Sequence, residues 1–169
     1  SKSAAESLCP AWANTWGLPI VVTHCCNVAG GDPRAVGQFM EKFIPMTIDK
    51  VMRGATVQIH SRGGVPSSRY YIDAEDVARA VQAVLDKGGI MSGPGTGKFN
   101  ITSDAEVSNL YVAKKIADLL GKRLNYELVD NVASRPRHDQ RYAITGERLR
   151  ALGWAPLYDI DACLSRCVD

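Results

Sequence analysis

The sequence has little net charge, no long apolar run and no signal-peptide layout, and each absence excludes a class of protein. Its 169 residues carry a formal net charge of +2, and the sequence pI is about 8.3. Proteins that bind nucleic acid usually carry a strongly basic stripe, so no nucleic-acid partner is expected and any acidic ligand should be small. No uninterrupted apolar stretch reaches the length of about 18 residues that a membrane span needs, so no membrane contact is predicted.

The five cysteines are not spaced like a metal site or a disulfide framework. Cys25 and Cys26 are adjacent in an apolar run, while Cys163 and Cys167 lie near the end of the chain. Metal sites use other spacings, and a disulfide framework uses an even number of cysteines. We therefore predict no metal site, and reduced thiols, most of them buried, in a cytoplasmic protein.

Apolar residues make up 46% of the chain, which is enough for the core of one ordinary domain or most of one. Strand-like runs alternate with helix-like runs along the sequence. The predicted strands span 20–26, 57–60, 70–72, 98–102 and 124–129, and the predicted helices span 1–16, 38–53, 74–87, 103–120 and 145–152, with a last helix from 159. This alternation predicts an α/β fold with crossover connections.

Two segments and the start of the chain carry more detailed expectations. The apolar run 20–26 is typical of a central strand that is buried on both faces of a parallel sheet. Residues 61–68, which are rich in glycine and serine, are predicted to form a flexible loop. The first helix begins without a capping residue or a preceding strand, so we interpret the start as truncated.

Polar residues mark the expected beginnings of three helices. Asp73 is predicted to cap the helix 74–87, with Asp76 in the reciprocal capping-box position. Ser103 and Glu106 have the same spacing and predict a second capping box. Helix starts are thus placed directly after Asp73 and Ser103, and a third is expected to be capped by Thr145.

The segment 135–142 gathers cationic side chains between a strand-like and a helix-like run. It contains Arg135, Arg137, His138 and Arg141, and a proline stiffens its backbone. The planar fork of a guanidinium group suits phosphate oxygens. The composition is therefore typical of an anion-binding loop, although a solvated basic loop on the surface would have the same composition.

Five separated segments occur in an order that resembles one enzyme family. They are Ser1-Lys2, 26–30 (CNVAG), 41–45 (EKFIP), 69–78 (RYYIDAEDVA) and 135–142 (RPRHDQRY). Over nearly its whole length the chain resembles the carboxy-terminal half of the extended short-chain dehydrogenase/reductases that act on nucleotide sugars, the NAD-dependent epimerase/dehydratase family. The nearest group is the sugar-nucleotide 4,6-dehydratases. The resemblance implies a Rossmann-like α/β fold, with 1–31 as the tail end of the dinucleotide-binding domain and 32–169 as the nucleotide-sugar-binding region.

The resemblance also implies a site for a dTDP-sugar or UDP-sugar. The residues that would bind this substrate are Asn27, Lys42, His60, Arg69, Arg135 and His138. Asn27 and Arg69 would hold the pyrophosphate, Lys42 and His138 would contact the nucleotide end, and His60 would lie beside the base. A pyrophosphate needs neutral and cationic donors from several elements, which these residue types supply.

Each of these residues also has a plain structural explanation when taken alone. Asn27 fits a turn, Lys42 a solvated helix lysine and His60 the end of a strand, and only their order along the chain favours the site. Asp104 stands where the family has an asparagine on the pyrophosphate. A carboxylate there would repel phosphate unless it turns away or only begins a helix.

The same resemblance gives Lys2 a catalytic and cofactor-binding role at the nicotinamide ribose of NAD. The tyrosine that pairs with this lysine in the family would precede Ser1, and the sequence contains no glycine-rich dinucleotide loop. The chain alone is therefore predicted to be inactive and not to bind NAD. It is expected to form a homo-oligomer or to need the missing amino-terminal half.

Two functions follow from these expectations. The first is the nucleotide-sugar-binding half of an NAD-dependent sugar-nucleotide 4,6-dehydratase or epimerase. The alternative is a non-enzymatic protein that binds nucleotide sugars, or a structural protein, derived from the same fold.

Overall fold

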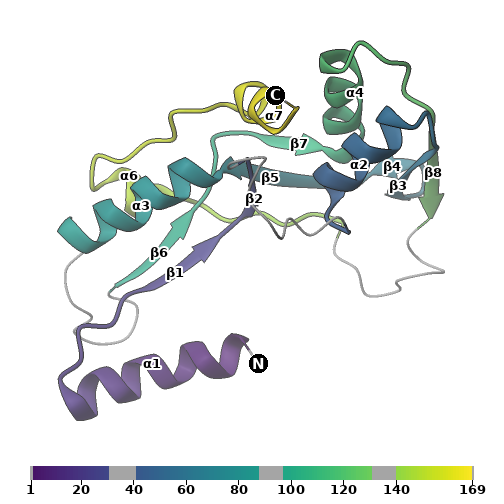
Figure 1. Cartoon of the computed structure of the whole chain (residues 1–169). Helices are drawn as coiled ribbons and strands as arrows, with labels where there is room; N and C mark the ends of the chain where they lie inside the picture. Colours follow the sequence, from purple (N-terminus) through teal and green to yellow (C-terminus); the bar gives the residue numbers. More distant parts are fainter. Residues whose placement is uncertain (1, 31–40, 88–96, 131–139, 169) are drawn as a thin grey trace.

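The computed structural model describes residues 2–30, 41–87, 97–130 and 140–168 (Figure 1). The helices are α1 (Lys2–Trp16), α2 (Phe43–Met52), α3 (Ala74–Lys87), α4 (Asn109–Leu119), α6 (Glu147–Arg150) and α7 (Ile160–Val168). The strands are β1 (Val22–Cys25), β2 (Asn27–Ala29), β3 (Val57–Arg62), β4 (Val65–Pro66), β5 (Ser68–Asp73), β6 (Lys98–Ile101), β7 (Glu106–Ser108) and β8 (Tyr126–Asp130). Helices alternate with strands, which confirms the predicted α/β class.

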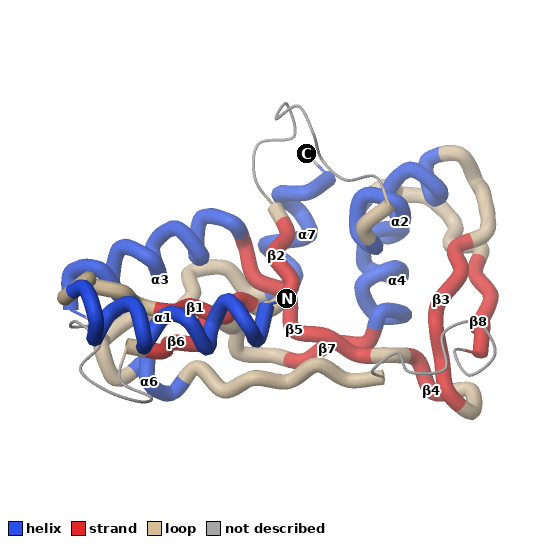
Figure 2. Tube along the Cα trace, turned by 90° about the horizontal axis from the view of Figure 1, so that it is seen from below, coloured by secondary structure: helices blue, strands red, loops and turns tan. Residues whose placement is uncertain are grey.

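The described strands form three small sheets, with the orders β1-β6, β2-β5-β7 and β4-β3-β8. The pairs β1/β6, β2/β5 and β3/β8 are parallel, as crossover connections require. Figure 1 shows β1 and β6 between α1 on one face and α3 on the other. Seen from below, β5 and β7 run from this end of an elongated molecule toward α2, α4, β3 and β8 at the other end (Figure 2).

Three clusters of buried side chains form the core. One lies beneath α3 and β6 and includes Ile72, Phe99 and Leu149. A second packs Tyr71 of β5 against α2, α4 and α7, and a third joins β3 to α2 and α4 around Ile59. The second cluster holds α7 against α2, α4 and β5, so residues that are far apart in the sequence meet there.

The strand predicted at 20–26 is present as β1, but it is not a central strand buried on both faces in this chain. Only Val22–Cys25 form β1, and among the described residues β1 pairs with β6 alone. The side chains of β1 alternate between half-buried and exposed. A strand is buried on both faces only when it has a partner strand on each edge and packed elements on each face, and the described part of the chain gives β1 a single partner strand. The chain then leaves this sheet, and Asn27–Ala29 pair with β5 as β2.

The prediction of a flexible loop at 61–68 is also wrong. Strand β3 continues to Arg62 and pairs with β4 in an antiparallel hairpin. The turn is made by Gly63 and Gly64, whose φ angles are 57° and 79°. Two adjacent residues with positive φ match the right-handed twist of a hairpin, and glycine adopts this conformation without strain.

The helix expected from Ser103 begins six residues later, at Asn109. Residues Glu106–Ser108 pair with β5 as strand β7, and the hydroxyl of Ser108 caps α4 by accepting from the backbone N of Tyr111 at 3.0 Å. The carboxylate of Glu106 is not available for a capping box because it accepts hydrogen bonds from other side chains, described below. The expected helix start was wrong, whereas the expected end before Gly121 is confirmed.

The other observed helix starts agree only in part with the starts predicted from the sequence. Asp73 caps α3 by accepting from the backbone N of Glu75 at 2.8 Å, and Asp159 caps α7 through Ala162 at 2.8 Å, so both are confirmed. Asp76 makes no capping box and instead binds the backbone before α7. Thr145 does not cap α6, which begins at Glu147 without a side-chain cap.

Helix α2 begins at Phe43, with Lys42 as its N-cap residue, whereas the start expected at residue 38 lies outside the described residues. Pro45 lies in its first turn, where a missing N–H costs little.

Among the cysteines only Cys163 is buried and Cys25 is exposed, so the expected burial of most thiols is wrong, although all five are free. Within the described segments, the helices are too short or too polar to cross a bilayer.

Candidate functional site

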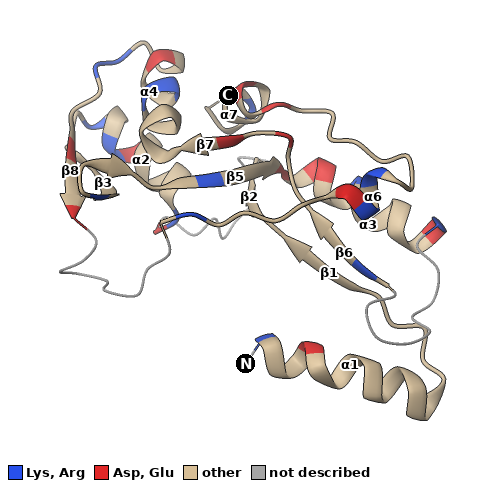
Figure 3. Cartoon of the chain, turned by 180° about the vertical axis from the view of Figure 1, so that it is seen from behind, with Lys and Arg blue, Asp and Glu red and all other residues tan. Residues whose placement is uncertain are grey.

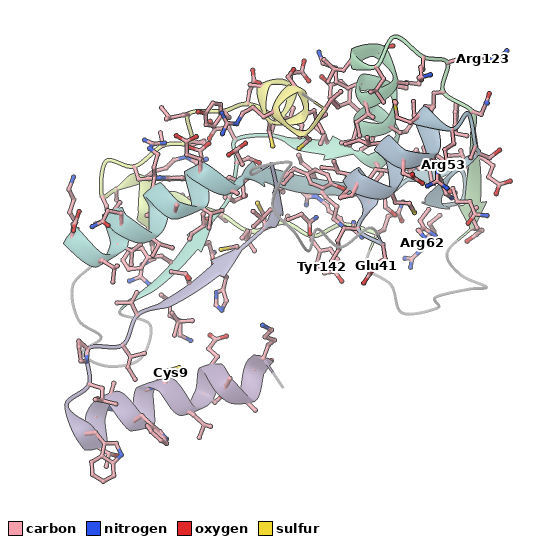
Figure 4. All side chains as sticks on the ribbon, in the orientation of Figure 1. Cys9, Glu41, Arg53, Arg62, Arg123 and Tyr142 are labelled. Atoms are coloured by element: carbon pink, nitrogen blue, oxygen red, sulfur yellow. The ribbon has the colours of Figure 1, made fainter. Side chains whose placement is uncertain are left out.

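An open cavity of about 800 Å³ lies where β2, β3, β5, the start of α2 and the end of α7 meet. Four of the predicted substrate-binding residues line it, namely Asn27, Lys42, His60 and Arg69. They come from β2, the N-cap of α2, β3 and β5, so the fold brings together side chains that are far apart in the sequence. Figure 4 shows Glu41 and Tyr142, which also line the cavity, on the same underside of the molecule.

The parallel pairing of β2 with β5 sets one wall of the cavity. Asn27 lies opposite Tyr71 in the register of the two strands. Arg69 and Tyr71 are two residues apart on β5, and alternate residues of a strand face the same side. Tyr71 was not among the predicted site residues, although its spacing from Arg69 was a usable signal.

Arg69 is only 6% exposed, and backbone carbonyls hold its guanidinium group. Nη1 donates to the carbonyl of Ser68 at 2.6 Å and to that of Gln140 at 2.8 Å. The ring of Tyr142 lies 4.5 Å from the guanidinium carbon, in the geometry of a cation–π contact. The last residues of the predicted basic loop are therefore packed against Arg69 at the edge of the cavity.

An ion pair fixes the same segment to β7. Nε of Arg141 donates to the carboxylate oxygens of Glu106 at 2.9 and 2.7 Å, and the hydroxyl of Ser68 donates to the same carboxylate. The Ser68 hydrogen bond and then the Arg141 guanidinium lower the pKa of Glu106 below its ordinary value. Arg141, which the sequence placed in an anion-binding loop, thus makes a structural contact.

Tyr71 and Asn109 form the back of the cavity. The Tyr71 hydroxyl donates to Oδ1 of Asn109 at 2.9 Å, and both residues are buried. Burial raises the pKa of Tyr71, since the charged form would lose its water. The hydroxyl is therefore neutral near pH 7 and acts as a structural donor.

Arg166 brings a further cation to the wall from α7. Its Nε lies 3.1 Å from Oδ2 of Asp73, and its Nη2 lies 3.0 Å from the carboxylate of Glu75. Its guanidinium carbon also lies 4.4 Å from the centre of the Tyr158 ring. The sequence held no signal for this residue, because α7 reaches the cavity only through tertiary packing.

The other predicted site residues are placed differently. Lys2 lies at the start of α1 and is not among the residues that line the cavity. Arg135 and His138 lie outside the described residues. Asp104 is exposed and pairs with Arg150 outside the cavity, so its carboxylate turns away from the site and does not begin a helix.

The charges of the site favour an anionic ligand over a metal ion. Within residues 2–30, 41–87, 97–130 and 140–168, no three histidine, cysteine or acidic side chains are placed to hold a metal. The wall carries more cationic than acidic groups, with Asn27 as a neutral amide donor: the cations are Lys42, Lys50, Arg69 and Arg166, and the acid is Glu41. Elsewhere, basic and acidic segments are interspersed over the helices and strands (Figure 3). The fold and the cavity therefore define an α/β protein with a ligand site whose wall is partly apolar and bears cationic groups.

Comparison with known proteins gives the family. Residues 1–101 match the NAD dependent epimerase/dehydratase family. This is more than half of the chain, and the chain therefore belongs to that family. It is 35% identical over 175 residues to dTDP-glucose 4,6-dehydratase 1 of Escherichia coli K12, covering 100% of this chain and 45% of that protein.

Solved structures of the same kind have the same fold. A dTDP-glucose 4,6-dehydratase from Bacillus anthracis, in complex with NAD, superposes on 99% of this chain and 49% of its own, with a TM-score of 0.80 and 29% identity. The dehydratase DesIV from Streptomyces venezuelae covers 99% of this chain and 48% of its own, with a TM-score of 0.80 and 26% identity. The chain thus spans about half the length of these relatives.

Proposed function

We propose that the cavity binds the nucleoside diphosphate part of a nucleotide sugar. The observation that carries this proposal is that one cavity gathers Asn27, Lys42, His60 and Arg69 from four separate elements. DesIV, which has the same fold, has been solved with NAD and TDP bound, which supports a thymidine or uridine nucleotide as the ligand.

The chemistry of the wall suits a pyrophosphate and a base. Cationic Lys42 and Arg69 compensate the charge of the phosphate oxygens, and the Asn27 amide adds a neutral donor. The flat imidazole of His60, on β3, can pack against the face of a base. Arg69 is already held by two carbonyls, so less side-chain entropy is lost when a ligand binds there.

We infer that the chain is the carboxy-terminal half of an NAD-dependent sugar-nucleotide 4,6-dehydratase or epimerase. Dinucleotide sites of this kind hold the NAD pyrophosphate on a glycine-rich turn between a strand and a helix. The sequence has no G-x-G-x-x-G segment, so the residues present do not fit the cofactor. Within this chain, the contribution to the reaction is therefore substrate binding, and hydride transfer is assigned to none of its residues.

The alternative function is a non-enzymatic protein that binds nucleotide sugars. It shares the cavity but requires no partner that supplies NAD. One experiment distinguishes the two functions. The purified chain is mixed with the amino-terminal half of a related dehydratase, and conversion of the substrate is measured. Conversion of dTDP-glucose or a UDP-sugar in that mixture favours the enzyme, and unchanged substrate with intact nucleotide binding favours the binding protein. We place either form in the cytoplasm, as a homo-oligomer or bound to its other half.

Calorimetric titration of the chain with dTDP and UDP tests the proposed site. Lys42→Ala, which removes an exposed side chain, is expected to weaken binding by roughly tenfold, and Arg69→Ala by roughly ten- to a hundredfold, because each removes a charge-assisted hydrogen bond. Arg123→Ala removes the same charge outside the cavity (Figure 4) and is expected to bind like the wild type. The proposal fails if the wild type binds neither nucleotide, or if Lys42→Ala and Arg123→Ala bind alike.

A further inference from the structure

His24 of β1 has an oxygen atom beside each of its two ring nitrogens. In the register of the two parallel strands it lies opposite Asn100 of β6, on the face of the small sheet that α1 covers (Figure 1). Nε2 of His24 lies 3.0 Å from Oε2 of Glu6 on α1, and Nδ1 lies 3.3 Å from Oδ1 of Asn100. The ring therefore bridges the helix and the neighbouring strand.

A second hydrogen bond of Asn100 fixes which of its polar atoms the ring meets. Nδ2 of Asn100 donates to the backbone carbonyl of Thr145 at 2.9 Å. A carbonyl only accepts, so the amide nitrogen points to Thr145 and the amide oxygen is left for His24. The carboxylate of Glu6 also only accepts. Each ring nitrogen of His24 therefore needs a proton to make its hydrogen bond.

The charge state of His24 decides how many of these hydrogen bonds form. The imidazolium cation carries a proton on both nitrogens, whereas neutral imidazole carries one. In either neutral tautomer one nitrogen directs a lone pair at an oxygen atom, and that hydrogen bond is lost. Docking of α1 and protonation of His24 therefore favour each other.

Two charged side chains from the neighbouring elements meet at this ring. The carboxylate of Glu6 attracts an imidazolium, and Nζ of Lys98 on β6, which lies 2.7 Å from Oε1 of the same carboxylate, repels it. The hydrogen bonds from Lys98 and then from His24 lower the pKa of Glu6, so this carboxylate stays charged in mild acid. Of the charged residues of α6, which packs against β6, Glu147 is exposed, Arg148 lies over the ring of Phe99, and Arg150 pairs with Asp104.

Helix α1 depends on these polar contacts because it buries little apolar surface. Ala13 is the one buried residue within Lys2–Trp16, whereas the shorter helix α4 buries five residues. The side-chain hydrogen bonds that join α1 to the sheet in the described part of the chain are those of Glu6. Loss of one of them should therefore loosen the whole helix.

We propose that His24 is a pH-dependent positioning residue that holds α1 on the β1–β6 sheet as an imidazolium and releases it when the second ring proton passes to water. A histidine side chain in water changes charge at about pH 6.5, so α1 is held in mild acid and loosens as pH rises above neutral. Lys2 lies one turn before Glu6 on the same helix, so the contact also sets the place of the Lys2 ammonium group. The proposal does not rest on the nucleotide site.

Hydrogen exchange measured by mass spectrometry tests the positioning. Amide exchange in α1 and α3 is followed in dilute solution at about pH 5.5 and about pH 8.5, and each rate is divided by that of an unstructured peptide at the same pH. Protection of α1 is expected to fall at least about fivefold relative to α3 at the higher pH. Equal protection of α1 at both pH values, or an equal fall in α3, overturns the proposal.

Two variants separate the charge of His24 from the stability of the fold. His24→Arg keeps a cation at every pH used and is expected to protect α1 equally at both pH values. Glu6→Gln is also expected to remove the pH dependence, because an amide can donate to the ring or accept from it. Thermal melts check that both variants fold. The pH dependence of the wild type in either folded variant overturns the proposal.

Nuclear magnetic resonance of the ring nitrogens tests the protonation directly. His24→Gln identifies the signals of His24 among those of the three histidines. Both ring nitrogens of His24 are expected to carry a proton at about pH 5.5, and one of them is expected to lose it as α1 loses its protection at higher pH. A neutral His24 ring at about pH 5.5 in the folded chain overturns the proposal.

Discussion

Asp76 is a fully buried carboxylate that joins α3 to the segment before α7. It accepts hydrogen bonds from the backbone N–H groups of Leu157 at 2.8 Å and Tyr158 at 3.1 Å, and its Oδ1 lies 2.7 Å from Nη1 of Arg79. A carboxylate offers two acceptor oxygens, whereas an asparagine offers one and adds a donor with no acceptor opposite it. We expect Asp76→Asn to lower the free energy of unfolding by about 2 to 4 kcal/mol.

Urea denaturation followed by circular dichroism measures this change. Asp86→Asn, at an exposed position of the same helix, is the matched control, because its carboxylate accepts a hydrogen bond from the exposed Gln82 side chain at 2.8 Å and from no backbone N–H among the described residues. It is expected to change the free energy of unfolding by less than about 0.5 kcal/mol. Equal effects of the two substitutions would show that Asp76 contributes no more than a surface residue.

Gly30 is restricted twice, by its backbone and by a neighbour. Its φ is 77°, and a methyl group on its Cα would overlap Oδ2 of Asp73, which Arg166 holds in place. Gly17 has a φ of 62° and open space around it, so it carries the backbone restriction alone. We expect Gly30→Ala to lower the free energy of unfolding by at least about 1 kcal/mol more than Gly17→Ala, and thermal melts of both variants would measure the difference.

At the scale of elements, the contact of Glu106 on β7 with Ser68 on β5 and with Arg141 predicts that the folding stability of the chain depends on pH. The pKa of Glu106 in the folded chain lies below its ordinary value of 4.5, first because of Ser68 and then because of Arg141. The unfolded chain therefore binds the proton more readily, and this stabilisation is complete above about pH 4.5 and is lost as pH falls through the lower folded pKa.

Unfolding curves between pH 7 and pH 3 test this dependence. The Glu106→Gln variant is expected to lose less stability than the wild type over the acid range, because it has no proton to take up there. Glu127→Gln, on the exposed face of β8, is the control and should keep the wild-type slope. If the free energy of unfolding falls equally with pH in the wild type and in Glu106→Gln, the pH dependence does not come from Glu106.

Local sequence signals predicted elements well where local contacts also decide the structure. Helix α3 begins after Asp73 and ends at Lys87 as expected, because its cap and the buried Ala80 and Val84 agree. The expected start at Ser103 failed because residues 106–108 pair with β5, which lies far away in the sequence. Such long-range pairing cannot be recognised from a short stretch of sequence, because the three residues of β7 are too few to show an alternating strand pattern.

At the scale of the whole molecule, the order of the family-like segments predicted the cavity better than any single residue did. Asn27 and Arg69 line the same cavity because β2 pairs with β5, and no local pattern contains that pairing. Arg166 and Cys167 were missed because they enter through packing of α7. The tertiary contacts of a parallel fold join distant segments, so residue spacing alone cannot show which side chains share a site.

The surface of α1 predicts self-association of the whole chain. Leu8, Trp12 and Trp16 are 57%, 55% and 69% exposed, and among the described residues β1 has one edge without a partner strand. Large exposed apolar surfaces and unpaired strand edges favour association in water. We expect light scattering to show a mass that rises with protein concentration, and Trp12→Glu to shift the chain toward monomer.

A matched control separates α1 from apolar surface in general. Leu85 on α3 is 70% exposed but lies away from α1, on the other face of the β1–β6 sheet (Figure 1), so Leu85→Glu is expected to leave association unchanged. Both substitutions add one negative charge, so a general effect of charge would appear in both. A constant monomer mass for the wild type up to high concentration, or equal effects of Trp12→Glu and Leu85→Glu, would contradict association through α1.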